Sequence, residues 1–299
     1  MSNWRLPEYE TVTGYIYDAA RVFPQNIAVS FNNVSITYRE LNRRSNQLAN
    51  YLLQKGLKPG QSVALVLERS PEIIIALLAI LKCGACYVPM DPNYPRDRVI
   101  FMAEDAAAQF YITNQKFSGR FAGSVANEIL LDTILTDLEK CSEADLPLQN
   151  NPEAIAYILY TSGSTGKPKG AMVSHGNLIH FLKGMQEVFN ITAQDKFLSV
   201  SSISFDASCF DNYLSLIHGA ELVLADNETA KSGDLLLKLI ADKKASIMLA
   251  TPVTYKLMLN AGWEDKIDAT VLSAGEPLPA TLARDLIPRC KSLYNVYGP

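Results

Sequence analysis

Strand-like apolar runs alternate with helical patterns along most of this sequence, and that alternation constrains the fold more than any other feature. The expected strands lie at residues 27–31, 34–36, 62–67, 109–113, 129–131, 155–160, 222–225, 246–250, 270–273 and 292–295. The expected helices lie at residues 37–55, 71–83, 96–107, 175–189, 207–219, 232–244, 253–261 and 279–287. Strands separated by helices favour units in which a helical crossover connects two parallel strands. The sequence therefore predicts an α/β fold with mainly parallel sheets, and a hairpin at Asn32 and Asn33.

Local signals mark several of the helix boundaries. Thr37 stands three residues before Glu40, which is the spacing of a capping box at the start of a helix. Gly56 suits the end of that helix, and Pro71 suits the first position of the next one. The helix after Pro71 is apolar on nearly all sides, which predicts deep burial. Residues 137–153 are polar and are expected to form an exposed connection.

Residues 161–170 read Thr-Ser-Gly-Ser-Thr-Gly-Lys-Pro-Lys-Gly and follow an apolar run. Glycines let backbone amides approach an anion, hydroxyls donate hydrogen bonds, and lysines supply positive charge. The common P-loop does not fit, because only two residues separate Gly163 from Gly166 and because Pro168 prevents a helix from starting directly after Lys167. A polar surface loop is the alternative, but two lysines that closely follow an expected buried strand in the sequence favour phosphate binding.

Composition and charge exclude several classes of protein. A hydrophobic content of 48% and a charged content of 19% fit a globular chain of 299 residues. The net charge of −4 gives no electrostatic reason to expect nucleic acid. The longest apolar run, residues 73–81, is too short to cross a membrane, and the N-terminus lacks an apolar signal region. We therefore expect a cytoplasmic protein with neither a membrane nor a nucleic acid among its partners.

Cysteines and histidines suggest packing rather than metal or redox chemistry. Cys83 and Cys86 have the spacing of a redox motif, but they follow an apolar helix, which favours core packing. The five cysteines are an odd number spread widely, which argues against a disulfide framework. The three histidines show no zinc-like arrangement, and His175 has no assigned chemical role, since a structural histidine is at least as consistent with its position.

Five stretches, in order, resemble the amino-acid adenylation domains of nonribosomal peptide synthetases. These domains belong to the adenylate-forming superfamily, which also includes acyl-CoA synthetases and luciferases. The matching stretches are residues 36–41, 81–91, 160–170, 205–208 and 295–299. The second stretch carries cysteines where alanines are usual, which supports the packing interpretation of Cys83 and Cys86.

The resemblance implies the large N-terminal subdomain of the adenylate-forming fold, with layered, mostly parallel sheets and helices packed between and around them. It implies one adenylation-domain core subdomain over residues 1–299, incomplete at its C-terminal end. The C-terminal subdomain, with the catalytic lysine, is expected beyond Pro299, so no catalytic residue and no metal ligand is assigned within the chain.

The implied reaction is ATP-dependent activation of an amino acid as an aminoacyl adenylate, with release of diphosphate and loading onto a phosphopantetheinylated carrier protein. The implied cofactors are ATP and Mg²⁺, and neighbouring synthetase domains are further implied partners. An acyl- or aryl-CoA ligase and a catalytically incomplete nucleotide-binding fragment remain alternatives, and a kinase-type P-loop protein is disfavoured by the loop spacing.

The resemblance also implies three groups of site residues. The phosphates are expected to bind at Thr161, Ser162, Gly163, Ser164, Thr165, Gly166, Lys167, Lys169 and Gly170. The adenine is expected to lie between Gly275, Glu276, Pro277, Asn295, Val296 and Tyr297, and a core tyrosine is the alternative for the last. The amino-acid substrate is expected to contact Asp206, Ala207, Phe210, Ala250, Leu272, Ala274 and Val296.

Asp206 is the residue through which the resemblance implies recognition of the substrate's α-ammonium group. A buried carboxylate among apolar residues is costly unless it is paired, so a cationic partner makes physical sense for a buried acid here. Capping of the following helix is the alternative, because aspartate is a favoured N-cap. The other expected pocket residues are all apolar, which predicts a substrate with an apolar side chain.

Overall fold

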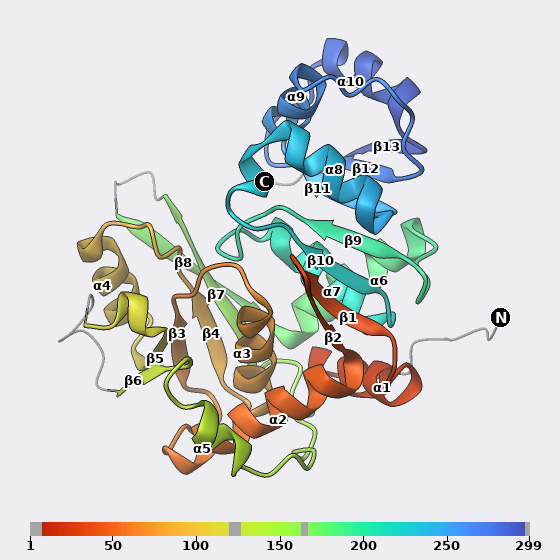
Figure 1. Ribbon diagram of the computed structural model, residues 1–299. Coiled ribbons are helices and arrows are strands. Elements are labelled where there is room, and N and C mark those ends of the chain that lie inside the picture. Colours follow the sequence, from red (N-terminus) through yellow and green to blue (C-terminus); the bar gives the residue numbers. More distant parts are fainter. Residues whose placement is uncertain (1–7, 120–126, 163–166, 297–299) are drawn as a thin grey trace.

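The computed structural model describes residues 8–119, 127–162 and 167–296, and its strands form two sheets (Figure 1). We call the seven-stranded sheet, which contains the last strand, sheet A. Its spatial order is β13 (Ser292–Asn295), β12 (Thr270–Ser273), β11 (Ile247–Ala250), β9 (Lys196–Ser199), β10 (Glu221–Leu224), β1 (Ile27–Phe31) and β2 (Val34–Thr37). All neighbours in it are parallel except β1 and β2, which form the predicted hairpin.

The six-stranded sheet, sheet B, is also parallel except at one edge. Its spatial order is β6 (Asn127–Leu130), β5 (Ala108–Thr113), β3 (Ser62–Leu65), β4 (Cys86–Pro89), β7 (Ile155–Ser162) and β8 (Pro168–Ser174). Strands β7 and β8 are antiparallel, and the other neighbouring pairs are parallel. The prediction of an α/β fold with mainly parallel sheets is confirmed.

Helices form a layer between the sheets and cover their outer faces. The α-helices are α1 (Val12–Val22), α2 (Tyr38–Gln54), α3 (Pro71–Lys82), α4 (Arg96–Asp105), α5 (Leu135–Glu139), α6 (His175–Val188), α7 (Ala207–Ile217), α8 (Gly233–Lys243), α9 (Pro252–Asn260) and α10 (Ala280–Leu286). The short 3₁₀ helices are η1 (Gln115–Phe117), η2 (Thr229–Lys231) and η3 (Ile287–Arg289). Buried residues of α1, α2, α3, α6 and α7 share one core with the facing sides of both sheets, whereas α8, α9 and α10 pack on the other face of sheet A, and α4 packs on the other face of sheet B (Figure 1).

Several predicted helix starts are confirmed at the level of single residues. Helix α3 begins at Pro71, and its residues from Pro71 to Leu81 are almost all buried. The Thr37 hydroxyl accepts a 3.2 Å hydrogen bond from the Glu40 backbone N–H and so caps α2. Only this half of the predicted capping box forms, because the Glu40 carboxylate pairs with Arg43 instead. None of the described helices has both the length and the apolar character needed to cross a bilayer.

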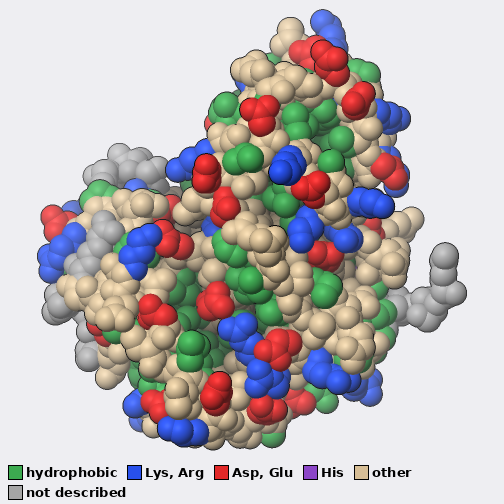
Figure 2. All heavy atoms as spheres, in the orientation of Figure 1, with side chains coloured by type: hydrophobic (Ala, Val, Ile, Leu, Met, Phe, Trp, Pro, Cys, Tyr) green, Lys and Arg blue, Asp and Glu red, His purple; other side chains and the backbone are tan. Residues whose placement is uncertain are grey.

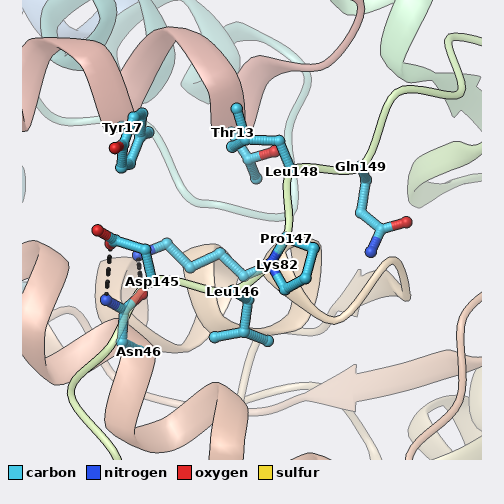
Figure 3. A pocket seen from close by; sticks show the side chains of 9 residues that line it. All are labelled: Thr13, Tyr17, Asn46, Lys82, Asp145, Leu146, Pro147, Leu148 and Gln149. Carbon is cyan, nitrogen blue, oxygen red and sulfur yellow. Dashed lines mark hydrogen bonds between the residues drawn. The ribbon is translucent and has the colours of Figure 1, made fainter.

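Residues 137–153 run from α5 toward β7, and part of this connection is tied to the helices beneath it. Asp145 accepts hydrogen bonds from the side-chain amides of Asn42 and Asn46, at 2.7 and 2.9 Å. Lys82, at the end of α3, donates to the amide oxygens of the same two residues, both at 2.7 Å. Figure 3 shows Lys82 pointing along this segment toward Asn46 and Asp145. Two amides thus relay the contact between the lysine and the carboxylate, and they fix the connection against α2 and α3.

Candidate functional site

The predicted phosphate segment, residues 161–170, begins at the end of one strand and ends within an antiparallel partner strand. Strand β7 runs to Ser162 and β8 starts at Pro168, with Thr161 opposite Lys169. Sequence reasoning missed β8, because Pro168, Lys169 and Gly170 resemble loop residues and β8 is mostly exposed. An antiparallel edge strand can nevertheless tolerate proline at its first position.

The described part of this segment presents its polar groups to solvent. Thr161, Lys167, Lys169 and Gly170 are exposed. Thr161 and Lys169 are cross-strand partners, so their side chains lie on the same face of the hairpin. Gly163, Ser164, Thr165 and Gly166, and the side chain of Ser162, lie outside the described residues.

Gly170 allows a tyrosine to cover the base of the hairpin. A Cβ atom at Gly170 would lie 3.0 Å from Ile158 Cγ2 and 3.1 Å from Tyr160 Cζ. The Tyr160 hydroxyl donates a 2.7 Å hydrogen bond to Asp105 Oδ2 at the end of α4. Burial and the neighbouring carboxylate raise the pKa of Tyr160 above its ordinary value. Sequence reasoning missed Asp105, because nothing in its local pattern indicates a contact with β7.

The second part of the site is the carboxyl edge of sheet A. In register, Ala250 lies beside Ser273 and Ser273 lies beside Asn295, so three neighbouring strands end together. Backbone hydrogen bonds continue past the strands, from the Ala274 N–H to the Ala250 oxygen at 3.1 Å and from the Val296 N–H to the Ser273 oxygen at 2.8 Å. The two predicted adenine segments therefore leave neighbouring strands at the same edge.

Strand β9 gives this edge a topological switch point. It lies between β10 and β11. The helix after β9, α7, packs in the core between the sheets, whereas the helix after β11, α9, packs on the opposite face of sheet A. Connections that leave neighbouring strands toward opposite faces open a crevice at their carboxyl ends, and open α/β sheets bind ligands in such crevices.

Most of the predicted substrate contacts lie on the α7 side of sheet A. Phe210 and Leu272 are buried in the core between the sheets, and Ala207, Ala274 and Val296 are partly buried against it. Ala250 instead packs in the core under α8, α9 and α10, because neighbouring residues along a strand point to opposite faces. Gly275, Glu276, Pro277 and Asn295 are exposed, and Tyr297 lies outside the described residues.

Asp206 is exposed, so the expectation of a buried acid at this position is wrong. It caps α7, and its Oδ1 accepts a 2.7 Å hydrogen bond from the Ala207 N–H. The N-cap alternative is therefore confirmed, and the exposed carboxylate is still free to meet a cation from solvent. Its neighbour Phe205 is 61% exposed, so an apolar surface lies beside the carboxylate.

The buried acid of α7 is Asp211, which sequence reasoning did not single out. Burial raises the pKa of the Asp211 carboxyl well above its ordinary value, while the Ser199 hydroxyl and the Arg69 charge act in the opposite direction. Asn212 is the only polar neighbour of Asp211 in the sequence. No local pattern shows that Asp211, rather than Asp206, is the buried acid.

His175 and the two spaced cysteines have structural environments. Burial lowers the pKa of His175 to about 4, and its Nδ1 accepts a 3.4 Å hydrogen bond from the Val12 N–H. Burial raises the pKa of Cys83 to about 12, and its thiol donates to the Ala49 oxygen. Cys86 is buried beside the Ser62 hydroxyl, at 3.2 Å. The packing interpretation of both cysteines is confirmed.

Within the described ranges, no three histidine, cysteine, aspartate or glutamate side chains gather closely enough to hold a metal ion.

The fold, with its switch point at the carboxyl edge of sheet A, is that of the AMP-binding enzymes. A family described as AMP-binding enzyme matches residues 16–299, and the chain belongs to that family.

Its relatives include nonribosomal peptide synthetases. A dimodular nonribosomal peptide synthase from Bacillus subtilis is 38% identical over 279 residues, covering 92% of this chain and 12% of the relative. Gramicidin S synthase 2 from Brevibacillus brevis is 34% identical over 300 residues, covering 98% of this chain and 7% of the relative. The chain thus spans a small fraction of the length of the relatives it matches.

Solved structures show the same fold. The nonribosomal peptide synthetase FmoA3 superposes with a TM-score of 0.88 at 26% identity, over 99% of this chain and 32% of that one. A four-domain nonribosomal peptide synthetase bound to AMP and glycine superposes with a TM-score of 0.84 at 29% identity, over 96% of this chain and 21% of that one. The N-terminal subdomain of NpsA from Klebsiella oxytoca superposes with a TM-score of 0.85 at 26% identity, over 97% of this chain and 72% of that one. The predicted fold, the N-terminal subdomain of adenylate-forming enzymes, is confirmed.

Proposed function

We propose that this protein activates an amino acid with an apolar side chain as its aminoacyl adenylate. The observation that carries the proposal is the convergence, at the switch point of sheet A, of an exposed carboxylate at the start of α7 with an apolar surface. Asp206 supplies the carboxylate, Phe205 beside it supplies the exposed apolar surface, and Phe210 and Leu272 lie in the core between the sheets. The relatives named nonribosomal peptide synthase support the amino-acid branch of the family.

In this proposal the nucleotide is held at both ends. Backbone amides, hydroxyls and lysines of residues 161–170 bind its β- and γ-phosphates. The adenine lies between residues 275–277 and 295–297, which leave neighbouring strands at one edge. The family description and solved relatives with a bound nucleotide support this placement.

The substrate's ammonium group pairs with Asp206, and its apolar side chain lies toward Phe210 and Leu272. A substrate carboxylate oxygen then attacks the α-phosphorus of ATP. A bond forms between that oxygen and phosphorus, and the bond from phosphorus to the diphosphate oxygen breaks. Both reactants are anions, so positioning and charge neutralisation supply most of the rate acceleration. Mg²⁺, when bound to the nucleotide, neutralises part of the phosphate charge.

The proposal places the adenylate before a carrier protein whose phosphopantetheine thiol accepts the aminoacyl group, within a larger synthetase in the cytoplasm. The names of the multimodular relatives support a synthetase context. An acyl- or aryl-CoA ligase and a fragment that binds nucleotide without turnover are the competing activities.

Amino-acid-dependent exchange of labelled diphosphate into ATP tests the proposal on the full-length protein. We expect exchange with Val, Leu, Ile or Phe and little with Asp or Lys. Strong exchange with Asp or Lys and none with the apolar amino acids would refute the apolar preference. Exchange with fatty or aryl acids but with no amino acid would favour the ligase, and nucleotide binding without any exchange would favour the non-catalytic fragment.

A further inference from the structure

Arg69 joins the carboxyl edge of sheet B to that of sheet A. It follows β3 in the chain, and its guanidinium group donates hydrogen bonds to three backbone carbonyl groups at the ends of β9 and β10. The acceptors are the oxygens of Ser199 at 3.3 Å and Ala225 at 3.5 Å, and the oxygen of Val200. The Ser199 oxygen also accepts a 3.1 Å hydrogen bond from the Ala225 N–H within sheet A, and the guanidinium group adds a fork of donors where these strands end.

The contact with Val200 fixes the start of the segment that carries Asp206. Residues 200–206 leave β9 and lead directly into α7. Few described contacts tie the middle of this segment to sheet B. One of them is the hydrogen bond from Ser204 Oγ to the Pro89 oxygen, which is long at 3.5 Å. The N–H of Phe205 bonds within the segment, to the Ser202 oxygen. Arg69 therefore holds the N-terminal end of residues 200–206, where the segment leaves β9 of sheet A.

Asp211, on α7, is a buried acid that interacts with the charge of Arg69. Its side chain is 1% exposed, and against the effect of burial the Ser199 hydroxyl at the end of β9 is the hydrogen-bonding group that lowers the pKa of its carboxyl. A nearby positive charge further stabilises the ionised form of a buried carboxyl. Of the groups near Asp211, the charge that favours its ionised form is Arg69.

The other carboxylates near Arg69 already have local partners. Asp91 and Asp226 also face its charge. Asp91 accepts a 2.8 Å hydrogen bond from the Asn93 N–H, and Asp226 accepts a 2.7 Å hydrogen bond from the Thr229 N–H. Asp211 is thus the carboxylate whose environment depends most on Arg69, and it lies on the same helix that Asp206 caps.

We propose that Arg69 is a positioning residue for amino-acid recognition, which it performs by fixing residues 200–206 from sheet B, and that its charge is coupled to the buried carboxyl of Asp211. The proposal rests on the proposed function in one respect, the role of Asp206 in binding the ammonium group. Loss of Arg69 frees the segment and lets Asp206 move relative to the nucleotide. Loss of the Asp211 carboxyl leaves the carbonyl contacts of Arg69 in place.

Hydrogen exchange of the full-length protein without ligand tests the positioning role independently of activity. In Arg69→Met, backbone exchange of residues 200–206 should become at least about tenfold faster, because locally opened segments exchange from low-stability states. Arg69→Lys keeps the charge but not the fork of donors, and it should give an intermediate rate with an unchanged melting temperature. Arg44→Met is the matched control, since Arg44 pairs with Glu72 between α2 and α3, and exchange of 200–206 should not change. Wild-type exchange rates at 200–206 in both Arg69 variants would overturn the proposal.

Kinetics and a double-mutant cycle complete the test. In the diphosphate-exchange assay, Arg69→Met should raise KM for the amino acid about 10- to 100-fold, because a small misplacement of a binding group in a site has a cost of this size. KM for ATP should stay nearly unchanged. Equal increases in both constants would overturn the selective role. Asp211→Asn in the Arg69→Met background should restore part of the lost thermal stability, whereas additive losses would overturn the coupling between Arg69 and Asp211. If no amino acid supports exchange of diphosphate, the proposed function fails, and the hydrogen-exchange result still decides the role of Arg69.

Discussion

Tyr160 and Asp105 are joined by a 2.7 Å hydrogen bond from the phenol to the carboxylate, and this bond ties β7 to the end of α4. The tyrosine side chain is nearly buried, and its ring lies against Gly170 on the partner strand. A hairpin at the edge of a sheet has few other neighbours, so the position of its turn depends on such contacts.

Tyr160→Phe should therefore weaken nucleotide binding and stability together. Loss of the hydroxyl removes one hydrogen bond to a charged group, which costs about 1–3 kcal/mol of folding free energy. We expect a lower melting temperature and a higher KM for ATP, with KM for the amino acid little affected. Asp105→Asn keeps an oxygen acceptor and should have a smaller effect than Asp105→Ala. Equal effects of the two Asp105 variants would contradict this account.

Gly170→Ala should destabilise the hairpin. Its Cβ would lie 3.0 Å from Ile158 and 3.1 Å from the Tyr160 ring, which is closer than ordinary contact. We expect a loss of about 1–3 kcal/mol, typical of overpacking, and weaker ATP binding by calorimetry. Gly184→Ala on α6 is the matched control, because no atom lies within 4 Å of its Cβ position. That control should gain roughly 0.5–1 kcal/mol from helix propensity; similar losses in both variants would exclude the steric explanation.

Asp206→Asn should separate helix capping from charge recognition. The amide oxygen can still accept the hydrogen bond from Ala207, so the melting temperature should stay near that of the wild type. The missing charge should raise KM for the amino acid by about tenfold or more, in line with the 1.5–3 kcal/mol of a hydrogen bond to a charged group. Asp206→Ala should lose both stability and recognition. An unchanged KM in Asp206→Asn would remove the ammonium role and leave the cap alone.

His175 should make the protein less stable as the pH falls from about 6.5 to about 4. Burial lowers its folded-state pKa to about 4, so the unfolded chain, with an ordinary pKa near 6.5, binds the proton more tightly. The stabilisation is fully present above about pH 6.5 and decreases by up to about 3 kcal/mol as the pH falls through this window. Melting temperatures of His175→Gln and the wild type should converge toward pH 4. His180→Gln, at an exposed position on the same helix, should show the wild-type dependence.

Local sequence signals were sufficient for most of the elements. Pro71 and Thr37 start helices where they were expected to, because proline geometry and side-chain capping act within one helical turn. Helices α1 and α5 and strands β4, β8 and β9 were not predicted. Strand β8 exists because β7 offers a long antiparallel partner, and that pairing is not visible in the composition of residues 168–174.

Which side chains are buried, and which residues distant in the chain they contact, depend on how the two sheets pack together. Asp206 and Asp211 are both aspartates of one short stretch, yet the first is exposed and the second is buried, since α7 turns only one of them toward β9 and Arg69. The chain order and residue types of this protein were enough to predict its mainly parallel α/β fold, because propensity and periodicity act over a few residues. The contacts of Arg69 with β9 and of Tyr160 with α4 follow from packing between segments distant in the chain, where shape and charge must fit in three dimensions.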